Sequence, residues 1–295
     1  MKIVLFGANG FLGSKVAAEL AEAHEVVTAA HDPTGVDYQL DLTDLAETKV
    51  LLVKEQPDVI VSCAGIVDKG EKARLNVTFT TNICEAVKQA GLKPERIIIS
   101  GSAGEYGQIA ASDLPVAETT PINAVGMYAE SKAEETATAL KYGEELGVKV
   151  VIARIFNPLG AGMAPGMLLP NLMRRAAAIK AGEETVFEVS RLDSKRDYID
   201  VRDVARAFRA LVESSLRYSV YNIGSGKVTT NELLIQTLKE LFDLPDDTEV
   251  HETSNEPEAL VACQADITRI QQDTDWAPQY SLREALQGAL DESSK

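Results

Sequence analysis

Apolar runs of strand length alternate with amphipathic stretches through the first half of the chain. The apolar runs lie near residues 2–6, 25–29, 58–62, 96–100 and 148–155, and helix-like patterns lie near 11–22, 43–55, 71–90 and 125–146. Alternation of this kind requires right-handed crossover connections, which place helices on both faces of a parallel sheet. The pattern therefore predicts an α/β fold with a doubly wound parallel sheet.

The pattern changes after Phe156. Residues 157–166 are rich in glycine and proline and predict a loop, and the helices expected near 168–180, 229–242 and 281–291 are separated by short extended pieces. We expect these pieces to form a smaller cap, while a helix at 201–213 and a strand at 218–223 return to the main sheet. The predicted domains therefore interleave, with 1–156 and 200–224 in the larger one and 157–199 and 225–295 in the cap.

A glycine-rich turn follows the first apolar run directly. The segment from Gly7 to Gly13 reads GANGFLG, a GxxGxxG pattern between a strand and a helix. Glycines at this spacing let the backbone approach a pyrophosphate, and the N-terminus of the helix favours the anion. A tight turn without a ligand is the alternative, but the position of the motif favours a Rossmann-type dinucleotide site that includes Gly7, Asn9, Gly10, Phe11, Leu12 and Gly13.

The turn after the second strand bears on the choice between NAD and NADP. A carboxylate there pairs with ribose hydroxyls, whereas a 2′-phosphate requires arginine or lysine. Ala30 stands where the acid is expected, and His31 and Asp32 follow it. Residues 16 to 48 contain neither arginine nor lysine. The sequence favours NAD, and His31 leaves NADP open.

Charge and cysteine content exclude several other classes of protein. The 295 residues include 29 basic and 45 acidic ones, and this net charge of −16 opposes contact with nucleic acid or anionic lipid. No apolar run approaches the roughly 18–20 residues of a membrane-spanning helix, and the short first run does not fit a signal peptide, so we expect a cytoplasmic enzyme. The spacing of Cys63, Cys84 and Cys263 predicts neither a disulfide nor a metal site, and we expect small buried apolar residues.

Six basic residues fall within thirty residues of one another in the sequence. Such a group can bind an anionic small molecule, although acidic residues are mixed among them and a solvated face of mixed charge is the alternative. The six are Arg174, Arg175, Arg191, Lys195, Arg196 and Arg202.

Candidate catalytic residues follow the strand at 96–100. Ligands of a doubly wound sheet bind beyond the carboxyl ends of its strands, where Ser102 would present its hydroxyl. Tyr128 and Lys132 lie at i and i+4 and share one face of the next predicted helix. In a chain with eight tyrosines, such a pair carries little weight alone, so the order of the motifs along the chain matters.

Taken in order, these motifs resemble the extended short-chain dehydrogenase/reductase superfamily, in its NAD-dependent epimerase/dehydratase group, which acts on nucleotide sugars. The resemblance covers nearly the whole chain and includes GANGFLG, SGSAGEYG, YAESK, RIFNPLG at 154–160, RDYIDVRDV at 196–204 and YNIGSG at 221–226. It implies an enzyme with NAD or NADP as cofactor. The further cofactor contacts that it implies are His31, Asp32, Asp41, Leu42, Cys63, Ala64, Gly65, Asn76, Tyr128, Lys132 and Phe156.

The resemblance also implies roles in hydride transfer at a carbon that bears oxygen. Tyr128 is the expected acid/base, Lys132 its electrostatic partner and a donor to the nicotinamide ribose, and Ser102 a donor to the substrate oxygen. A free phenol with a pKa of about 10 is a poor base at neutral pH, but a nearby ammonium group and the positive nicotinamide ring favour its phenolate form. Each pKa unit of such a shift needs about 1.4 kcal/mol.

For the substrate, the resemblance places Asn157 at the diphosphate and Arg196 at the nucleotide end. A capping amide at Asn157 and an ion pair of Arg196 with Asp197 or Asp200 are the structural alternatives. Ala103 and Arg191 complete the candidate substrate contacts.

Departures from the family pattern narrow the expected reaction. Gly104 stands where the dehydratases of the group carry a carboxylate, so dehydration is disfavoured, and 255–258 lacks the usual Arg-Pro pair. The chain looks most like reductases of GDP- or dTDP-linked 4-keto-6-deoxyhexoses. A nucleotide-sugar 4-epimerase that retains NAD and a non-catalytic protein that senses NAD(P) are the alternatives. By resemblance we expect a homodimer formed through the helices at 71–90 and 125–146.

Overall fold

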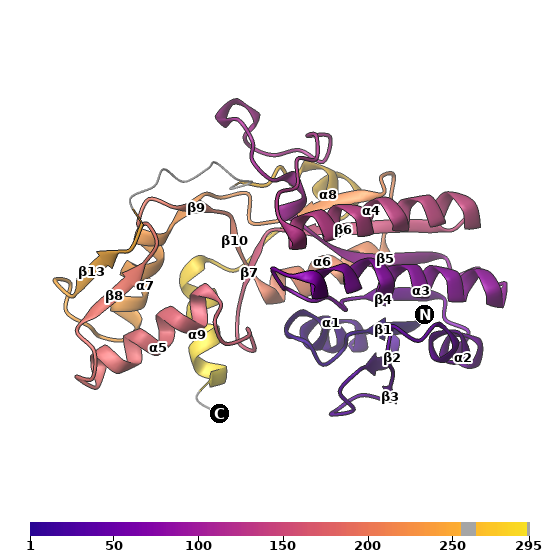
Figure 1. Cartoon of the computed structure of the whole chain (residues 1–295), viewed down its shortest axis with the longest axis horizontal. Coiled ribbons are helices and arrows are strands. Elements are labelled where there is room, and N and C mark those ends of the chain that lie inside the picture. Colours follow the sequence, from indigo (N-terminus) through magenta and orange to yellow (C-terminus); the bar gives the residue numbers. More distant parts are fainter. Residues whose placement is uncertain (255–263, 294–295) are drawn as a thin grey trace.

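The computed structural model, which describes residues 1–254 and 264–293, contains a seven-stranded parallel sheet with helices on both faces (Figure 1). The strand order is β3-β2-β1-β4-β5-β6-β11. The chain therefore builds outward from β1 in one direction and then from β4 in the other, which confirms the predicted doubly wound sheet. In this order the strands are Tyr38–Gln39, Glu25–Ala30, Lys2–Phe6, Val59–Ser62, Arg96–Ser102, Lys149–Ile155 and Val220–Ile223.

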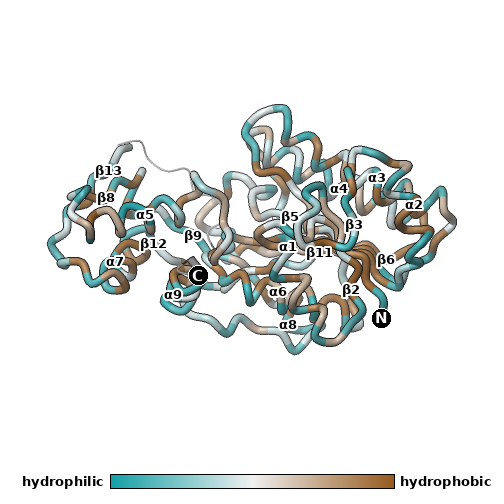
Figure 2. The backbone as a smooth tube through the Cα atoms, turned by 90° about the horizontal axis from the view of Figure 1, so that it is seen from below, coloured by the Kyte–Doolittle hydropathy of each residue, from teal (hydrophilic) through white to brown (hydrophobic). Residues whose placement is uncertain are grey.

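Both faces of the sheet are buried, which explains why its strands are apolar throughout. On one face, Ile3 and Leu5 of β1 pack in the core that α1 (Phe11–Ala21) and α6 (Val201–Glu213) cover. On the other face, Val4 and Phe6 pack under α2 (Leu45–Glu55), α3 (Leu75–Ala90) and α4 (Met127–Leu146). Successive residues of a strand point to opposite faces, so a strand covered on both sides needs an unbroken apolar run. Figure 2 shows this hydrophobic colouring on the strands at the centre of the sheet.

The chain returns to the sheet after residues 157–199. Helix α6 packs beside α1, and β11 pairs in parallel with β6, with Val220 opposite Ile152. The sheet therefore contains a strand that follows residues 157–199 in the chain. The exact domain boundaries stay a prediction.

The cap has a hydrophobic core of its own at the far end of the molecule from α2 (Figure 1). Short strands pair within it, β8 with β13 in parallel and β9 with β12 antiparallel. Leu169, Phe187, Leu238 and Leu286 are among its buried residues. Its elements are α5 (Leu168–Lys180), β8 (Val186–Val189), β9 (Lys195–Arg196), β12 (Thr229–Thr230), α7 (Asn231–Leu241), β13 (Glu249–Glu252) and α9 (Leu282–Ser293).

One loop prediction is wrong at its start. The expected loop at 157–166 begins with a short strand, β7 (Asn157–Leu159), which pairs in parallel with β10 (Tyr198–Asp200). Pro158 has no N–H to donate, but β7 belongs to a two-stranded pair, where one edge needs no donor. The prolines and glycines of this segment therefore predict a loop where the structure has a short strand.

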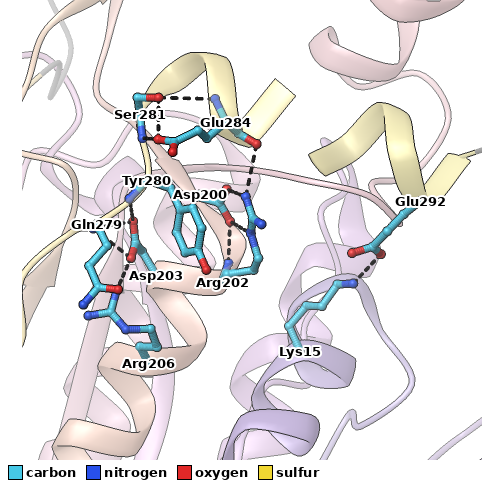
Figure 3. A network of polar contacts seen from close by, with 10 residues as sticks. All are labelled: Lys15, Asp200, Arg202, Asp203, Arg206, Gln279, Tyr280, Ser281, Glu284 and Glu292. Carbon is cyan, nitrogen blue, oxygen red and sulfur yellow. Dashed lines mark hydrogen bonds and ion pairs between the residues drawn. The ribbon is translucent and has the colours of Figure 1, made fainter. Parts of the chain in front are cut away.

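The C-terminal segment joins the cap to the sheet (Figure 3). The carboxylate of Asp203, on α6, accepts hydrogen bonds from the backbone N–H groups of Gln279 and Tyr280, each at 3.0 Å. Farther along, Lys15 of α1 forms an ion pair of 2.5 Å with Glu292 of α9. Helix α8 (Thr268–Asp273) packs against β11. Contacts on α1 and α6 thus fix the position of α9 relative to the sheet.

The cysteines differ in burial. Cys84 is buried as predicted, whereas Cys63 is only partly buried because it borders a cavity. Cys263 lies outside the described residues, as does the segment 255–258. None of the helices within 1–254 and 264–293 combines the length and the apolar character that crossing a membrane requires.

Candidate active site

A cavity of about 490 Å³ lies over the carboxyl ends of β1, β2 and β4, where the strand order reverses. This is the position where doubly wound sheets bind their ligands. Ten of the residues predicted to bind the cofactor line the cavity, namely Gly7, Asn9, Gly10, His31, Asp32, Asp41, Leu42, Cys63, Ala64 and Gly65. Phe11, Leu12, Gly13, Asn76, Tyr128, Lys132 and Phe156 are not among its lining residues.

Sequence reasoning missed most of the apolar lining. Leu75 and Phe79 of α3 border the cavity, and they lie at i and i+4 on the helix where Asn76 was singled out. That spacing places both side chains on one helix face, which is the signal that could have found them. The other missed lining residues are Phe6, Ala29, Ala30, Leu40, Thr43 and Ile66.

The glycine turn fits a pyrophosphate. Gly7 has a φ of +74°, and a Cβ there would lie 2.5 Å from the backbone N of Ala64. A Cβ at Gly13 would lie 2.0 Å from the carbonyl oxygen of Gly7. These two glycines therefore permit a tight turn. Gly10 is the N-cap of α1 and no side chain caps this end, which leaves backbone N–H groups for an anion.

Two carboxylates, those of Asp32 and Asp41, also line the cavity. Asp32 accepts a hydrogen bond of 2.8 Å from the backbone N of Thr34, and the hydrogen bonds with Thr34 lower its pKa. Hydrogen bonds with Thr43 similarly lower the pKa of Asp41. Both groups are thus ionised at neutral pH. They can accept hydrogen bonds from ribose hydroxyls but repel a phosphate.

Ser102 and Tyr128 lie on either side of Gly104. A Cβ at Gly104 would be 3.3 Å from Ser102 Oγ and 4.0 Å from Tyr128 Cε1. The hydroxyl of Ser102 accepts a hydrogen bond of 3.1 Å from the backbone N of Gly104. Its own proton therefore stays available to a substrate. The structure brings the predicted serine and tyrosine together, from the end of β5 and the first turn of α4.

The side chain of Glu105, the residue after Gly104, points away from this place. Its side chain is fully buried, accepts a hydrogen bond of 2.8 Å from the backbone N of Ser102 and forms an ion pair of 2.9 Å with Arg154. The carboxylate of Glu105 thus fixes the backbone at Ser102 and does not face a substrate.

Lys132 is buried one turn after Tyr128. Its Nζ donates a hydrogen bond of 2.6 Å to the carbonyl oxygen of Ser100 and forms an ion pair with Glu135. Burial tends to lower the pKa of Lys132, but the charges of Glu135 and Tyr128 raise it, and the net shift of this pKa is upward. The ammonium form therefore persists next to Tyr128. Sequence reasoning missed Glu135, although a carboxylate at i+3 from a lysine on a helix is a readable signal.

Asn76 and Phe156 are buried and do not line the cavity. The amide of Asn76 accepts a hydrogen bond of 2.8 Å from the backbone N of Ile66 and donates one of 3.3 Å to Ser131 Oγ. Asn76 therefore connects the loop after β4 to the start of α4. Phe156 is buried with its ring centroid 6.4 Å from that of Tyr106.

The predicted substrate residues lie in and beside the cap. Asn157 donates a hydrogen bond of 3.0 Å to the carbonyl oxygen of Asp197, the capping contact named as an alternative. Arg196 donates one of 2.6 Å to the carbonyl oxygen of Lys195. Arg191 forms an ion pair of 2.6 Å with Asp193. Ala103 is buried directly after Ser102.

The basic residues between Arg174 and Arg202 have acidic partners within the protein. Arg174 and Arg175 both form ion pairs with Glu184, and Arg202 forms one of 2.6 Å with Asp200. The Arg191 pair adds another such contact among the described residues, and these ion pairs fit the mixed-charge face.

Comparison with known proteins agrees with this geometry. Residues 3–224 match the model of the NAD dependent epimerase/dehydratase family. GDP-6-deoxy-D-mannose reductase from Pseudomonas aeruginosa is 28% identical, over 98% of this chain and 96% of the relative. A UDP-glucose 4-epimerase from Lactobacillus helveticus is 27% identical, over 95% and 93%. A solved structure of RMD from Pseudomonas aeruginosa complexed with NADPH has a TM-score of 0.88 at 26% identity, covering 100% of this chain and 99% of the other. These matches confirm the predicted family resemblance and the nicotinamide dinucleotide as the class of cofactor.

Proposed function

Because the chain belongs to the NAD dependent epimerase/dehydratase family, we propose that it is an NAD(P)H-dependent reductase of a nucleotide-linked 4-keto-6-deoxy sugar. The observation that carries this proposal is the placement of Ser102 and Tyr128 around Gly104, with no carboxylate at that position. Such a site can protonate a carbonyl oxygen, but residue 104 offers no base for removing a proton from carbon. The similarity to GDP-6-deoxy-D-mannose reductase supports this substrate class.

In this reaction the bound cofactor supplies the hydride. Ser102 donates its free hydroxyl proton in a hydrogen bond to the 4-keto oxygen, which holds that oxygen beside Tyr128. The phenol of Tyr128 gives its proton to the same oxygen as negative charge develops there, and the product is an alcohol. The Lys132 ammonium stabilises the phenolate that remains.

The roles of the remaining site residues are proposed from their positions in the structure. The glycine turn would bind the pyrophosphate, and Asp32 and Asp41 would face the adenosine ribose. Asn157, Arg191 and Arg196 would contact the diphosphate and nucleotide of the substrate, and Ala103 its sugar. A homodimer through α3 and α4 and a cytoplasmic location stay predictions.

A cofactor-oxidation screen tests the reductase. Protein purified without added nucleotide is mixed with NADH or NADPH and with GDP- or dTDP-4-keto-6-deoxyhexoses. We expect little retained cofactor and oxidation only when a 4-keto sugar is present.

The 4-epimerase is the second candidate, favoured by the same three side chains and by the epimerase relative. An epimerase would release nearly one equivalent of NAD on acid treatment and would interconvert UDP-sugars at C4 with no net change in cofactor. These results would support the epimerase and contradict the reductase. Cofactor binding without any turnover would instead indicate a sensor.

A further inference from the structure

A buried carboxylate lies directly behind Lys132 and has no role in the reaction described above. Glu135 follows Lys132 on α4, and the two side chains are only 2% and 4% exposed. One oxygen of Glu135 pairs with Lys132 Nζ, and the other accepts a hydrogen bond of 2.8 Å from Thr80 Oγ1 on α3. Tyr128 precedes Lys132 by one helical turn. The ammonium therefore lies between the phenol and this carboxylate along the helix.

A buried ammonium group needs a counter-ion. Removal from water disfavours the charged form of lysine and can lower its pKa by about 3–5 units. The carbonyl oxygen of Ser100 supplies Lys132 with a hydrogen bond but no negative charge. Among the residues that the structure describes, Glu135 is the carboxylate in direct contact with Lys132.

The other titratable groups around Lys132 cannot replace Glu135. Glu105, after β5, raises the pKa of Lys132 only as the last of its causes, and its oxygens already bind Ser102 and Arg154. Burial raises the pKa of the Cys63 thiol at the end of β4, so this group is neutral. Thr80 on α3 has no charge. Glu135 therefore supplies the fixed negative charge that Lys132 lacks elsewhere.

We propose that Glu135 is a positioning residue for the reduction, one that keeps the Lys132 ammonium charged and fixed beside Tyr128. This inference rests on the proposed function for the role of Tyr128 as acid. The carboxylate acts through Lys132 and touches neither substrate nor cofactor. Without the negative charge of Glu135, a smaller fraction of Lys132 would be protonated near neutral pH. The phenolate of Tyr128 would then lose the positive charge that stabilises it.

Three variants test this role. Glu135→Gln keeps the size of the side chain and an acceptor for Thr80 but removes the charge. Glu135→Asp keeps the charge. Glu134→Gln is the matched control, because it removes the same charge from the neighbouring, exposed position of α4.

The readout is the pH profile of 4-keto-sugar reduction, together with the phenolate absorbance of the cofactor-bound protein relative to Tyr128→Phe. With Glu135→Gln we expect the high-pH decline of the reduction rate to move to higher pH. The reverse oxidation, which needs the phenolate, should slow roughly tenfold or more at neutral pH. Glu135→Asp should restore most of this rate, and Glu134→Gln should match the parent. A Glu135→Gln profile that superimposes on the parent profile, or that moves to lower pH, would overturn the proposal.

Folding and function are checked separately. Thermal unfolding and NAD(P)H binding report whether Glu135→Gln folds. If it does not, Thr80→Val removes the hydroxyl that fixes Glu135 and should move the profile in the same direction by a smaller amount, whereas no movement would contradict the proposal. The absorbance titration needs no substrate. It therefore decides the role of Glu135 even if no 4-keto sugar is reduced and the proposed function fails.

Discussion

The substitution Glu105→Gln tests the buried ion pair beneath Ser102. Glu105 is fully buried and accepts hydrogen bonds from the backbone N of Ser102 at 2.8 Å and from Arg154 Nε and Nη2 at 3.1 and 2.9 Å. The guanidinium of Arg154 also lies 4.5 Å from the centre of the Tyr106 ring. Glutamine preserves the shape of the side chain, but its amide N–H groups then face either Arg154 or the backbone N–H of Ser102.

The expected cost follows from the burial of both partners, whose side chains are 4% and 0% exposed. Removing one member of a buried ion pair costs about 3–5 kcal/mol, because the other charge stays in a low-dielectric interior. That is a large part of the roughly 5–15 kcal/mol that stabilises a folded domain. Since each kcal/mol lowers the melting temperature of a large domain by about 2–4 °C, we expect a fall of about 6–20 °C.

Urea unfolding followed by circular dichroism measures this free energy, and thermal melting gives the temperature. Glu144→Gln removes a charge from an exposed position of α4 and should change stability by less than about 0.5 kcal/mol. The double variant Glu105→Leu with Arg154→Met should be less destabilised than the sum of its single variants, because it leaves no unpaired charge. A loss of less than about 1 kcal/mol for Glu105→Gln would refute the reasoning, since the pair would then contribute no more than an exposed one.

Two further predictions concern the active site. Tyr128→Phe should lower the reduction rate by about 10²–10⁴ with nearly unchanged cofactor affinity, because the phenol is needed only where the proton moves. Steady-state kinetics and a binding titration separate the two effects, and a loss of less than about tenfold would mean that another group is the acid. NAD(H) should bind more tightly than NADP(H), because the ionised Asp32 and Asp41 line the cavity, where we propose that they meet the adenosine ribose, and residues 16–48 contain no arginine or lysine. Fluorescence titration of both reduced cofactors checks this, and a preference of about tenfold or more for NADPH would contradict it.

The central sheet could be predicted because its signal is local. Ile3 and Leu5 face one layer of helices, and Val4 and Phe6 face the other. The apolar run of β1 therefore indicates by itself that the strand is buried on both faces. The pairing of β7 with β10 could not be predicted in this way. It joins residues 157–159 to residues 198–200, and the prolines and glycines near β7 are also typical of a loop. Two-residue strands such as β9 and β12 form because the surrounding cap brings them together, and their own residues contain too little pattern to indicate it.

The same distinction applies to the site. The glycine turn and the Tyr128–Lys132 spacing lie in continuous segments, so their positions could be read directly from the sequence. Phe79 and Glu135 have readable spacings from Leu75 and Lys132, but the spacings alone do not give their roles, which depend on how α3 packs beside the cavity and against α4. A glutamate three residues after a lysine is ordinary on an exposed helix. Only burial makes it a counter-ion, and burial is a property of the packed helices.

The two buried ion pairs of the site are connected through a single strand. Glu105, paired with Arg154, accepts from the backbone N of Ser102, and Lys132, paired with Glu135, donates to the carbonyl oxygen of Ser100. Both contacts fall on alternate residues at the carboxyl end of β5, the strand that presents the Ser102 hydroxyl. Each buried charge has its own counter-ion. The charge of the Lys132 ammonium is therefore stabilised locally, although the whole chain has a net charge of −16. An acidic protein can thus maintain a positive charge beside the group that we propose as the acid, since buried side chains of the fold supply that charge.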